Sequence, residues 1–184
     1  MLFYFPTYTI VVQPSLASED LSTGRQFESS STCGLFGPED ISIPLSPGDV
    51  EPYICDATDP ERSHSSGSLN DQDDPLNISS RTWWQSESSI EEVSIKLSLG
   101  GFYFLGGVRI DFRLPAPSVV VVEASQDFGE KYSPLRYYSD SCELDFNLPS
   151  TSLEGAGKTE RICTSDFSSS GGDDNIVSDR KGVY

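Results

Sequence analysis

Strict alternation of apolar and polar residues predicts half-buried β-strands in the second half of the chain. The first alternation covers residues 93–99, where Val93, Ile95, Leu97 and Leu99 are separated by Ser94, Lys96 and Ser98. A second alternation covers residues 108–114. The β-branched run 119–122 and the aromatic stretch 132–138 predict two further strands. Gly100-Gly101, Gly106-Gly107 and the turn 126–129 are predicted to end or separate these strands.

The remaining chain lacks such periodicity. Residues 19–92 are rich in Ser, Pro, Gly and Asp, which predicts loops with few strands. We interpret residues 1–18 as a degraded signal or irregular leader, because Met1 to Val12 are largely apolar but no Lys or Arg precedes Arg25. Residues 166–184 are predicted to be a disordered tail. The expected fold is an all-β, antiparallel, jelly-roll-like sandwich over residues 19–165, with a long loop-rich N-terminal part.

Charge narrows the classes of partner. The chain has 184 residues and a formal net charge of −17. That charge repels nucleic-acid phosphates and anionic lipids. It suits calcium, basic protein partners or solubility, and acidity alone does not choose among them. No segment reaches the roughly 20 apolar residues that span a bilayer.

The cysteine count points to an oxidising compartment. The chain contains Cys33, Cys55, Cys142 and Cys163, with no Cys-x-x-Cys pair, and one histidine. These numbers disfavour a zinc site and favour two disulfides over four reduced, buried thiols. Four cysteines allow three connectivities, and the residues alone do not select one.

Five ordered motifs resemble one known family. They are Ser31-Thr32-Cys33-Gly34-Leu35, Tyr53-Ile54-Cys55-Asp56-Ala57, Thr82-Trp83-Trp84-Gln85-Ser86-Glu87, Ser125-Gln126-Asp127-Phe128-Gly129 and Tyr137-Tyr138-Ser139-Asp140-Ser141-Cys142. In this order they resemble the laminin N-terminal domain, which laminin short arms and netrins share. Asp20-Leu21 with Gly24-Arg25, and the Trp83-Trp84 pair, resemble the laminin β type. The resemblance covers roughly residues 19–165.

The resemblance implies a disulfide pairing and a galactose-binding-like sandwich. The family usually carries two more cysteines, at places that correspond to Ser42 and Pro52. Their joint loss suggests that they pair with each other in relatives, which leaves Cys33–Cys55 and Cys142–Cys163 as the bridges here. The family domain also continues beyond Cys163, so the last sandwich strand is expected to be missing from this chain.

The resemblance also implies a calcium site at one edge of the sandwich. Asp71 and Thr82 would supply side-chain oxygens and Ser68 a backbone carbonyl, with a further carbonyl from the absent C-terminal part. The acidic loop Asn70-Asp71-Gln72-Asp73-Asp74 offers hard oxygens but lacks the EF-hand spacing, and a solvated acidic turn is the alternative. Asn77-Ile78-Ser79 is an N-glycosylation sequon, or else an unmodified polar loop.

Several side chains are candidates for an interface. Trp83 and Trp84 suit a binding platform, although a core position is expected for one of them. Glu123, Asp127 and Arg136 suit a polar interface or solvated strand edges.

Catalysis has little support: His64 lies among serines, but there is no Gly-x-Ser-x-Gly elbow and no oxyanion loop.

The resemblance implies a secreted, basement membrane protein whose partners are other laminin-type N-terminal domains, matrix proteins or cell-surface proteins. In laminins these domains polymerise through calcium-dependent contacts. The alternatives are a netrin-like guidance or adhesion ligand read by a receptor, a glycan-binding module by fold analogy, and a truncated product without a function of its own.

Overall fold

The computed structural model describes residues 2–5, 10–13, 21–46, 49–69, 82–112, 117–151, 161–165 and 175–183. Strands dominate these residues. In chain order the elements are β1 (Leu2–Phe5), β2 (Ile10–Gln13), β3 (Phe27–Ser29), β4 (Glu39–Ser46), β5 (Asp49–Cys55), the 3-10 helix η1 (Ser66–Leu69), β6 (Val93–Leu97), β7 (Phe104–Phe112), β8 (Val119–Ala124), β9 (Ser133–Ser139), α1 (Cys142–Phe146), β10 (Cys163–Thr164) and β11 (Asn175–Val183). No helix among them is long and apolar enough to cross a membrane.

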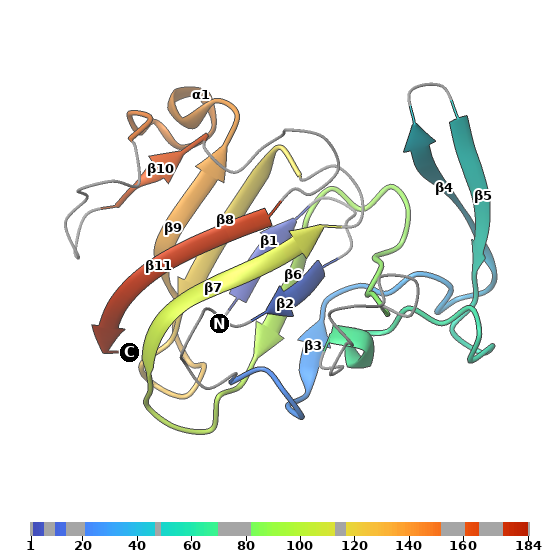
Figure 1. Ribbon diagram of the computed structural model, residues 1–184, viewed down its shortest axis with the longest axis horizontal. Coiled ribbons are helices and arrows are strands. Elements are labelled where there is room, and N and C mark those ends of the chain that lie inside the picture. The colour runs from blue at the N-terminus through green and yellow to red at the C-terminus, as the bar shows by residue number, and fades with distance from the viewer. Residues whose placement is uncertain are drawn as a thin grey trace.

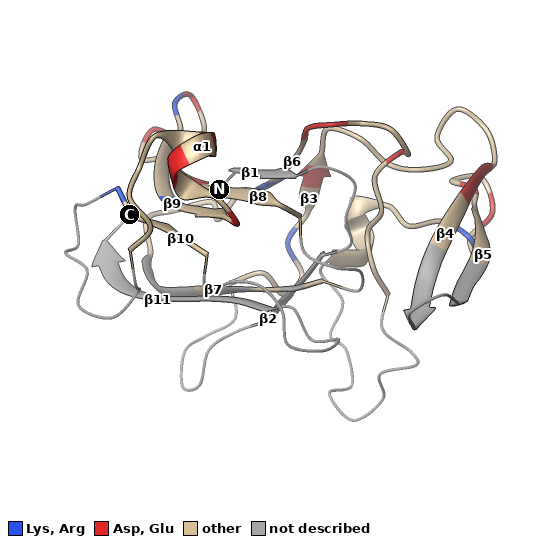
Figure 2. Ribbon diagram, turned by 90° about the horizontal axis from the view of Figure 1, so that it is seen from above, with Lys and Arg blue, Asp and Glu red and all other residues tan. Residues whose placement is uncertain are grey.

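Two sheets stack face to face. The larger sheet has the order β10-β9-β8-β1-β6-β3, and the smaller one has the order β11-β7-β2. Figure 2 views the two layers edge-on, and Figure 1 shows β7 and β11 lying across the larger sheet. All ladders are antiparallel except β10 with β9. The predicted all-β sandwich is therefore confirmed, while its jelly-roll connectivity stays a prediction.

The alternating residues build the core between the sheets. On β6, Val93, Ile95 and Leu97 are buried while Ser94 and Lys96 are not. β8 buries Val120 and Val122 in the same way. Together with residues of β7, β9 and the loops they form one apolar cluster: Phe27, Leu69, Trp84, Val93, Ile95, Leu97, Ile110, Phe112, Val120, Val122 and Tyr138.

One expectation about strand boundaries was wrong. The Gly106-Gly107 pair does not end a strand, because β7 runs through it and pairs with β11 at Gly107. The register of β11 shifts between Asp179 and Gly182, so an irregularity lies beside the glycines rather than a break. Within residues 19–92, the described part holds β3, β4 and β5 among loops, which agrees with the few strands predicted there.

The ends of the chain also differ from expectation. β1, in the segment interpreted as a leader, pairs with both β6 and β8 inside the larger sheet. β2 pairs with β7 in the smaller sheet. β11, in the segment predicted to be disordered, pairs with the other edge of β7. A sandwich strand therefore follows Cys163, contrary to the expectation that it would be missing.

Strands β4 and β5 form a separate two-stranded sheet that projects beside the sandwich (Figure 1). Ser42 lies directly opposite Pro52 in this hairpin. Directly opposed residues of an antiparallel pair have neighbouring Cβ atoms. The two places where the family resemblance expects extra cysteines are thus cross-strand neighbours.

Candidate functional site at the Cys33–Cys55 disulfide

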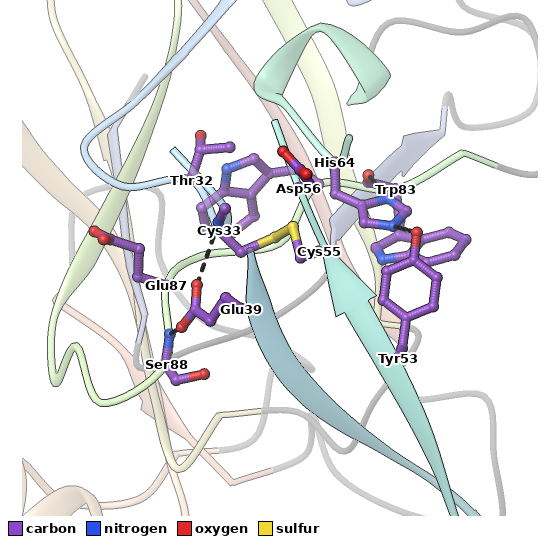
Figure 3. The surroundings of a disulfide bond; sticks show 12 residues. Thr32, Cys33, Glu39, Tyr53, Cys55, Asp56, His64, Trp83, Glu87 and Ser88 are labelled. Atoms are coloured by element: carbon purple, nitrogen blue, oxygen red, sulfur yellow. Dashed lines mark hydrogen bonds between the residues drawn. A yellow bond between two sulfur atoms is a disulfide. The ribbon is translucent and has the colours of Figure 1, made fainter. Parts of the chain in front are cut away.

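The Cys33–Cys55 disulfide joins the β3–β4 loop to the end of β5. The Cα atoms of the two cysteines are 5.9 Å apart, and both residues are fully buried. Figure 3 shows Glu39 beside the bridge. Its carboxylate accepts hydrogen bonds from the backbone N–H groups of Gly34, at 3.3 Å, and Ser88. One side chain of β4 therefore ties the disulfide loop to the segment that follows the tryptophans.

Trp84 belongs to the core and not to an exposed platform. Its side chain is 0% exposed, and its Nε1–H donates to the Ser31 carbonyl at 3.0 Å. The backbone N–H of Cys33 in turn donates to the Gln85 carbonyl at 2.9 Å. Trp84 is thus excluded as a direct interface residue, and it fixes the tryptophan segment against the disulfide loop.

Trp83 lies half-buried in a stack of rings (Figure 3). Its ring lies on His64 with centroids 3.9 Å apart and an interplanar angle of 17°. The His64 Nδ1 lies 3.3 Å from the Trp83 carbonyl, and Nε2 lies 2.7 Å from the Tyr53 hydroxyl. A carbonyl only accepts, so Nδ1–H donates to it, and in the neutral imidazole Nε2 then accepts from the Tyr53 hydroxyl. Both imidazole nitrogens are engaged, which removes the basis for pairing His64 with a neighbouring serine as a catalytic base.

We expect Tyr53→Phe to destabilise the protein by about 1–2 kcal/mol, because it leaves a nearly buried imidazole nitrogen without its donor. His64 is only 6% exposed, so water does not readily replace the hydroxyl. Urea unfolding measures the difference. Tyr132→Phe, at a half-buried tyrosine of another loop, is the control and should change stability by less than about 0.5 kcal/mol. Equal effects of the two variants would contradict this role for Tyr53.

Two of the three predicted calcium ligands meet in the structure. The Thr82 hydroxyl donates to the Ser68 carbonyl at 3.0 Å, across the ends of the segment 70–81. This separation is that of an ordinary hydrogen bond, and it would also let both oxygens reach one calcium ion at about 2.3–2.6 Å. Asp71 and the sequon residue Asn77 lie outside the described residues. Within the described ranges no group of three His, Cys, Asp or Glu residues could hold a metal.

The second disulfide joins Cys142 to Cys163, with their Cα atoms 5.7 Å apart. It ties α1 to β10, and both cysteines are buried. The structure thus has the two pairings that the family resemblance implied.

The three polar interface candidates separate into different environments. Arg136 is 4% exposed, because the inward positions of β9 alternate through Arg136 and Tyr138. Its predicted place on an interface is therefore wrong for this structure. Glu123 lies half-buried on β8. Asp127 lies in the β8–β9 turn, where its carboxylate accepts from the Lys131 N–H and the Ser125 hydroxyl.

Glu123 and Asp127 should change stability with pH in opposite directions. Burial raises the pKa of Glu123 above its ordinary 4.5. The folded state then holds this proton more tightly than the unfolded state, so the ionised group lowers stability as pH rises above 4.5. The hydrogen bonds from the Lys131 N–H and then Ser125 lower the pKa of Asp127 below 3.8. That stabilisation is present above pH 3.8 and is lost as pH falls through the folded pKa.

We therefore expect Glu123→Gln to raise the melting temperature at pH 7, by no more than about 2 °C. Asp127→Asn should lower the melting temperature at pH 7. Thermal unfolding across pH 3 to 7 measures both, and each difference should shrink toward the acid end. The same sign for both variants at pH 7 would contradict the assignment.

Sequence reasoning missed three residues of this site. Tyr53 stands in one of the five family motifs, but neither its contact with His64 nor the role of Glu39 is marked there, because their partners lie at distant positions and become visible only in the fold. His64 was considered for catalysis, whereas it packs against Trp83. Its position as the single histidine of an acidic chain was the one signal available.

Sequence comparisons match this chain to one protein family and to several known proteins. The sequence profile of the Laminin N-terminal (Domain VI) family matches residues 13–176. Laminin subunit beta-1 of Drosophila melanogaster is 33% identical over 160 residues, which is 83% of this chain and 9% of that protein. Laminin subunit gamma-3 of Mus musculus is also 33% identical over 160 residues, 82% of this chain and 10% of that protein. Netrin-4 of Homo sapiens is 28% identical over 155 residues, 82% of this chain and 24% of that protein. The chain therefore spans a quarter or less of the length of these relatives.

Proposed function

Because the chain belongs to the laminin N-terminal (domain VI) family, we propose that it assembles with other laminin-type N-terminal domains through protein–protein contacts. Laminins and netrins are secreted basement membrane proteins, so the chain is a secreted, extracellular matrix module. The family is a structural one without enzymatic activity. The identity of the contacts is what the proposal adds.

The proposal includes a calcium site at the edge formed by η1 and Thr82. The observation that carries it is the 3.0 Å approach of the Thr82 hydroxyl to the Ser68 carbonyl. Asp71 lies in the segment between these two residues and would add the carboxylate. Calcium prefers such a mixture of carboxylate, hydroxyl and carbonyl oxygens.

Binding at this edge would order the surface beside Trp83. Thr82 directly precedes Trp83, which stacks on His64, while Gln85 bonds back to both the His64 and Cys33 backbones. If calcium has already ordered this edge, the edge loses less conformational entropy when a partner binds it. Calcium would then strengthen assembly without contacting the partner.

Thermal unfolding of the oxidised chain tests the calcium site. At a calcium concentration ten times the dissociation constant the native state gains about 1.4 kcal/mol, which is roughly 3–6 °C for a chain of this size. Asp71→Ala should abolish the shift and Thr82→Val should reduce it. Glu61→Ala, at an exposed carboxylate after β5, is the matched control and should keep the shift. A shift that persists in Asp71→Ala would contradict the proposed site.

A netrin-like ligand is the second candidate, and the match to Netrin-4 favours it. Laminin-type assembly predicts binding to laminin N-terminal domains that calcium strengthens. A netrin-like ligand predicts binding to a cell-surface receptor instead, whether or not calcium is present.

A further inference from the structure

The loop that follows Cys33 exposes two large apolar side chains at its tip. Phe36 is 87% exposed and Leu35 is 59% exposed, and Ile54 of the neighbouring strand β5 is 42% exposed. We call Leu35 and Phe36 the apolar tip. Burying an aromatic side chain of this kind on association is favourable, and Phe is enriched at protein–protein interfaces relative to the rest of the surface.

The apolar tip is held on a braced loop. Cys33 is fixed by the disulfide, and the Gly34 N–H donates to the Glu39 carboxylate. The Gly34 carbonyl accepts from the Ala57 N–H at 3.2 Å. Gly34 packs so closely on Cys55 and Asp56 that an added Cβ would lie 2.7 Å from their backbone atoms. The base of the loop is therefore ordered before any partner arrives, which reduces the entropic cost of binding.

Acidic residues surround the base of the apolar tip. The flanking segments 39–42 and 54–62 carry Glu39, Asp40, Asp56, Asp59 and Glu61 against one base, Arg62. Arg62 lies 3.5 Å from the Asp59 carboxylate and so neutralises part of one charge. Hydrogen bonds from the Thr58 side chain and backbone lower the pKa of Asp56, so that carboxylate stays ionised. Figure 2 shows acidic residues where β4 and β5 meet the rest of the chain.

We propose that the apolar tip inserts into an apolar pocket rimmed by Lys and Arg on a protein partner. An acidic surface around an apolar anchor favours a basic rim around an apolar pocket, because complementary charges speed association and disfavour other partners. A second copy of this chain is disfavoured, since each copy carries a net charge of −17. The same charge disfavours nucleic acids and anionic membranes.

The inference rests on the proposed assembly and names the surface and partner chemistry that assembly would use. Two measurements keep the two ideas apart. The first is surface plasmon resonance of the full chain against the N-terminal domains of the laminin beta-1 and gamma-3 relatives, in calcium, from 50 to 300 mM NaCl. The second is fluorescence anisotropy with a synthetic amphipathic helical peptide whose leucine face is rimmed by lysines.

Phe36→Ser should weaken binding of both probes by at least about 10-fold. The triple variant Asp40→Asn, Asp59→Asn, Glu61→Gln should lower the association rate and flatten its salt dependence. Leu144→Ser is the matched control, because Leu144 is 85% exposed and lies between Glu143 and Asp145. It should change binding by less than about 2-fold. All three variants should keep the calcium-induced rise in melting temperature.

Equal peptide binding by wild type and Phe36→Ser would overturn the inference, whatever the laminin domains do. If the chain bound a neutral glycan or an acidic peptide but not the basic peptide, that result would also overturn the inference. Peptide binding that depends on Phe36, together with no binding to either laminin domain, would support the basic-rimmed partner while contradicting the proposed assembly.

Discussion

Replacing Gly34 with alanine is expected to destabilise the domain by about 3 kcal/mol or more. Gly34 has φ +69°, a left-handed conformation that disfavours a Cβ. The added Cβ would also lie 2.7 Å from the Asp56 Cα and the Cys55 carbonyl oxygen, and 2.8 Å from the Ala57 nitrogen. All three atoms belong to the backbone, next to a disulfide that prevents β5 from moving away. Typical domains have 5–15 kcal/mol of stability in total, so a large part of the secreted protein should be lost.

Gly24→Ala separates the conformational effect from the collision. Gly24 has nearly the same φ, +72°, but no atom lies within 4 Å of its added Cβ. It should therefore cost only about 1–2 kcal/mol, the penalty of a left-handed alanine. Guanidinium unfolding and the yield of secreted protein compare the two variants. Equal losses at the two glycines would contradict the close packing of the β3–β4 loop on β5.

Replacing Trp84 with alanine should cost about 3–5 kcal/mol, as is usual for a fully buried large aromatic residue. The ring is part of the core cluster that both sheets share, and its Nε1–H bond holds the Ser31 carbonyl. Loss of the ring leaves a cavity at the point where the disulfide loop meets the sandwich. The free energy of urea unfolding measures this change.

Two further variants divide the Trp84 effect. Trp84→Phe keeps most of the apolar volume but leaves the Ser31 carbonyl without its donor, so it should cost less than the alanine variant. Trp83→Ala removes a half-buried ring and should cost less than Trp84→Ala. If Trp83→Ala were the more damaging change, the assignment of Trp84 to the core would be wrong.

The sequence predicted strands well where burial alternates. Val93, Ile95 and Leu97 face the core because a strand places every second side chain on one face. The hairpin β4–β5 was missed because Pro44 and Pro52 interrupt it and because it forms its own small sheet beside the sandwich. β11 was missed because Ser178-Asp179-Arg180-Lys181-Gly182 has no apolar period, and its pairing with β7 is a tertiary effect.

The candidate site was predictable only in part. Ordered motifs identified the family, and with it the disulfide pairing, while the calcium ligands Ser68, Asp71 and Thr82 stay a prediction. The burial of Arg136 was not predictable, because charged side chains are rarely found inside and local sequence gives no sign of the exception. The stack of Tyr53, His64 and Trp83 joins three segments whose sequence spacing carries no periodic signal.

Sedimentation velocity of this chain mixed with the laminin beta-1 and gamma-3 N-terminal domains tests the central claim most directly. The proposed assembly predicts a faster-sedimenting complex in millimolar calcium that disappears when the calcium is chelated and fails to form with Asp71→Ala. Absence of any complex in calcium, or a complex that chelation and Asp71→Ala leave unchanged, would contradict it.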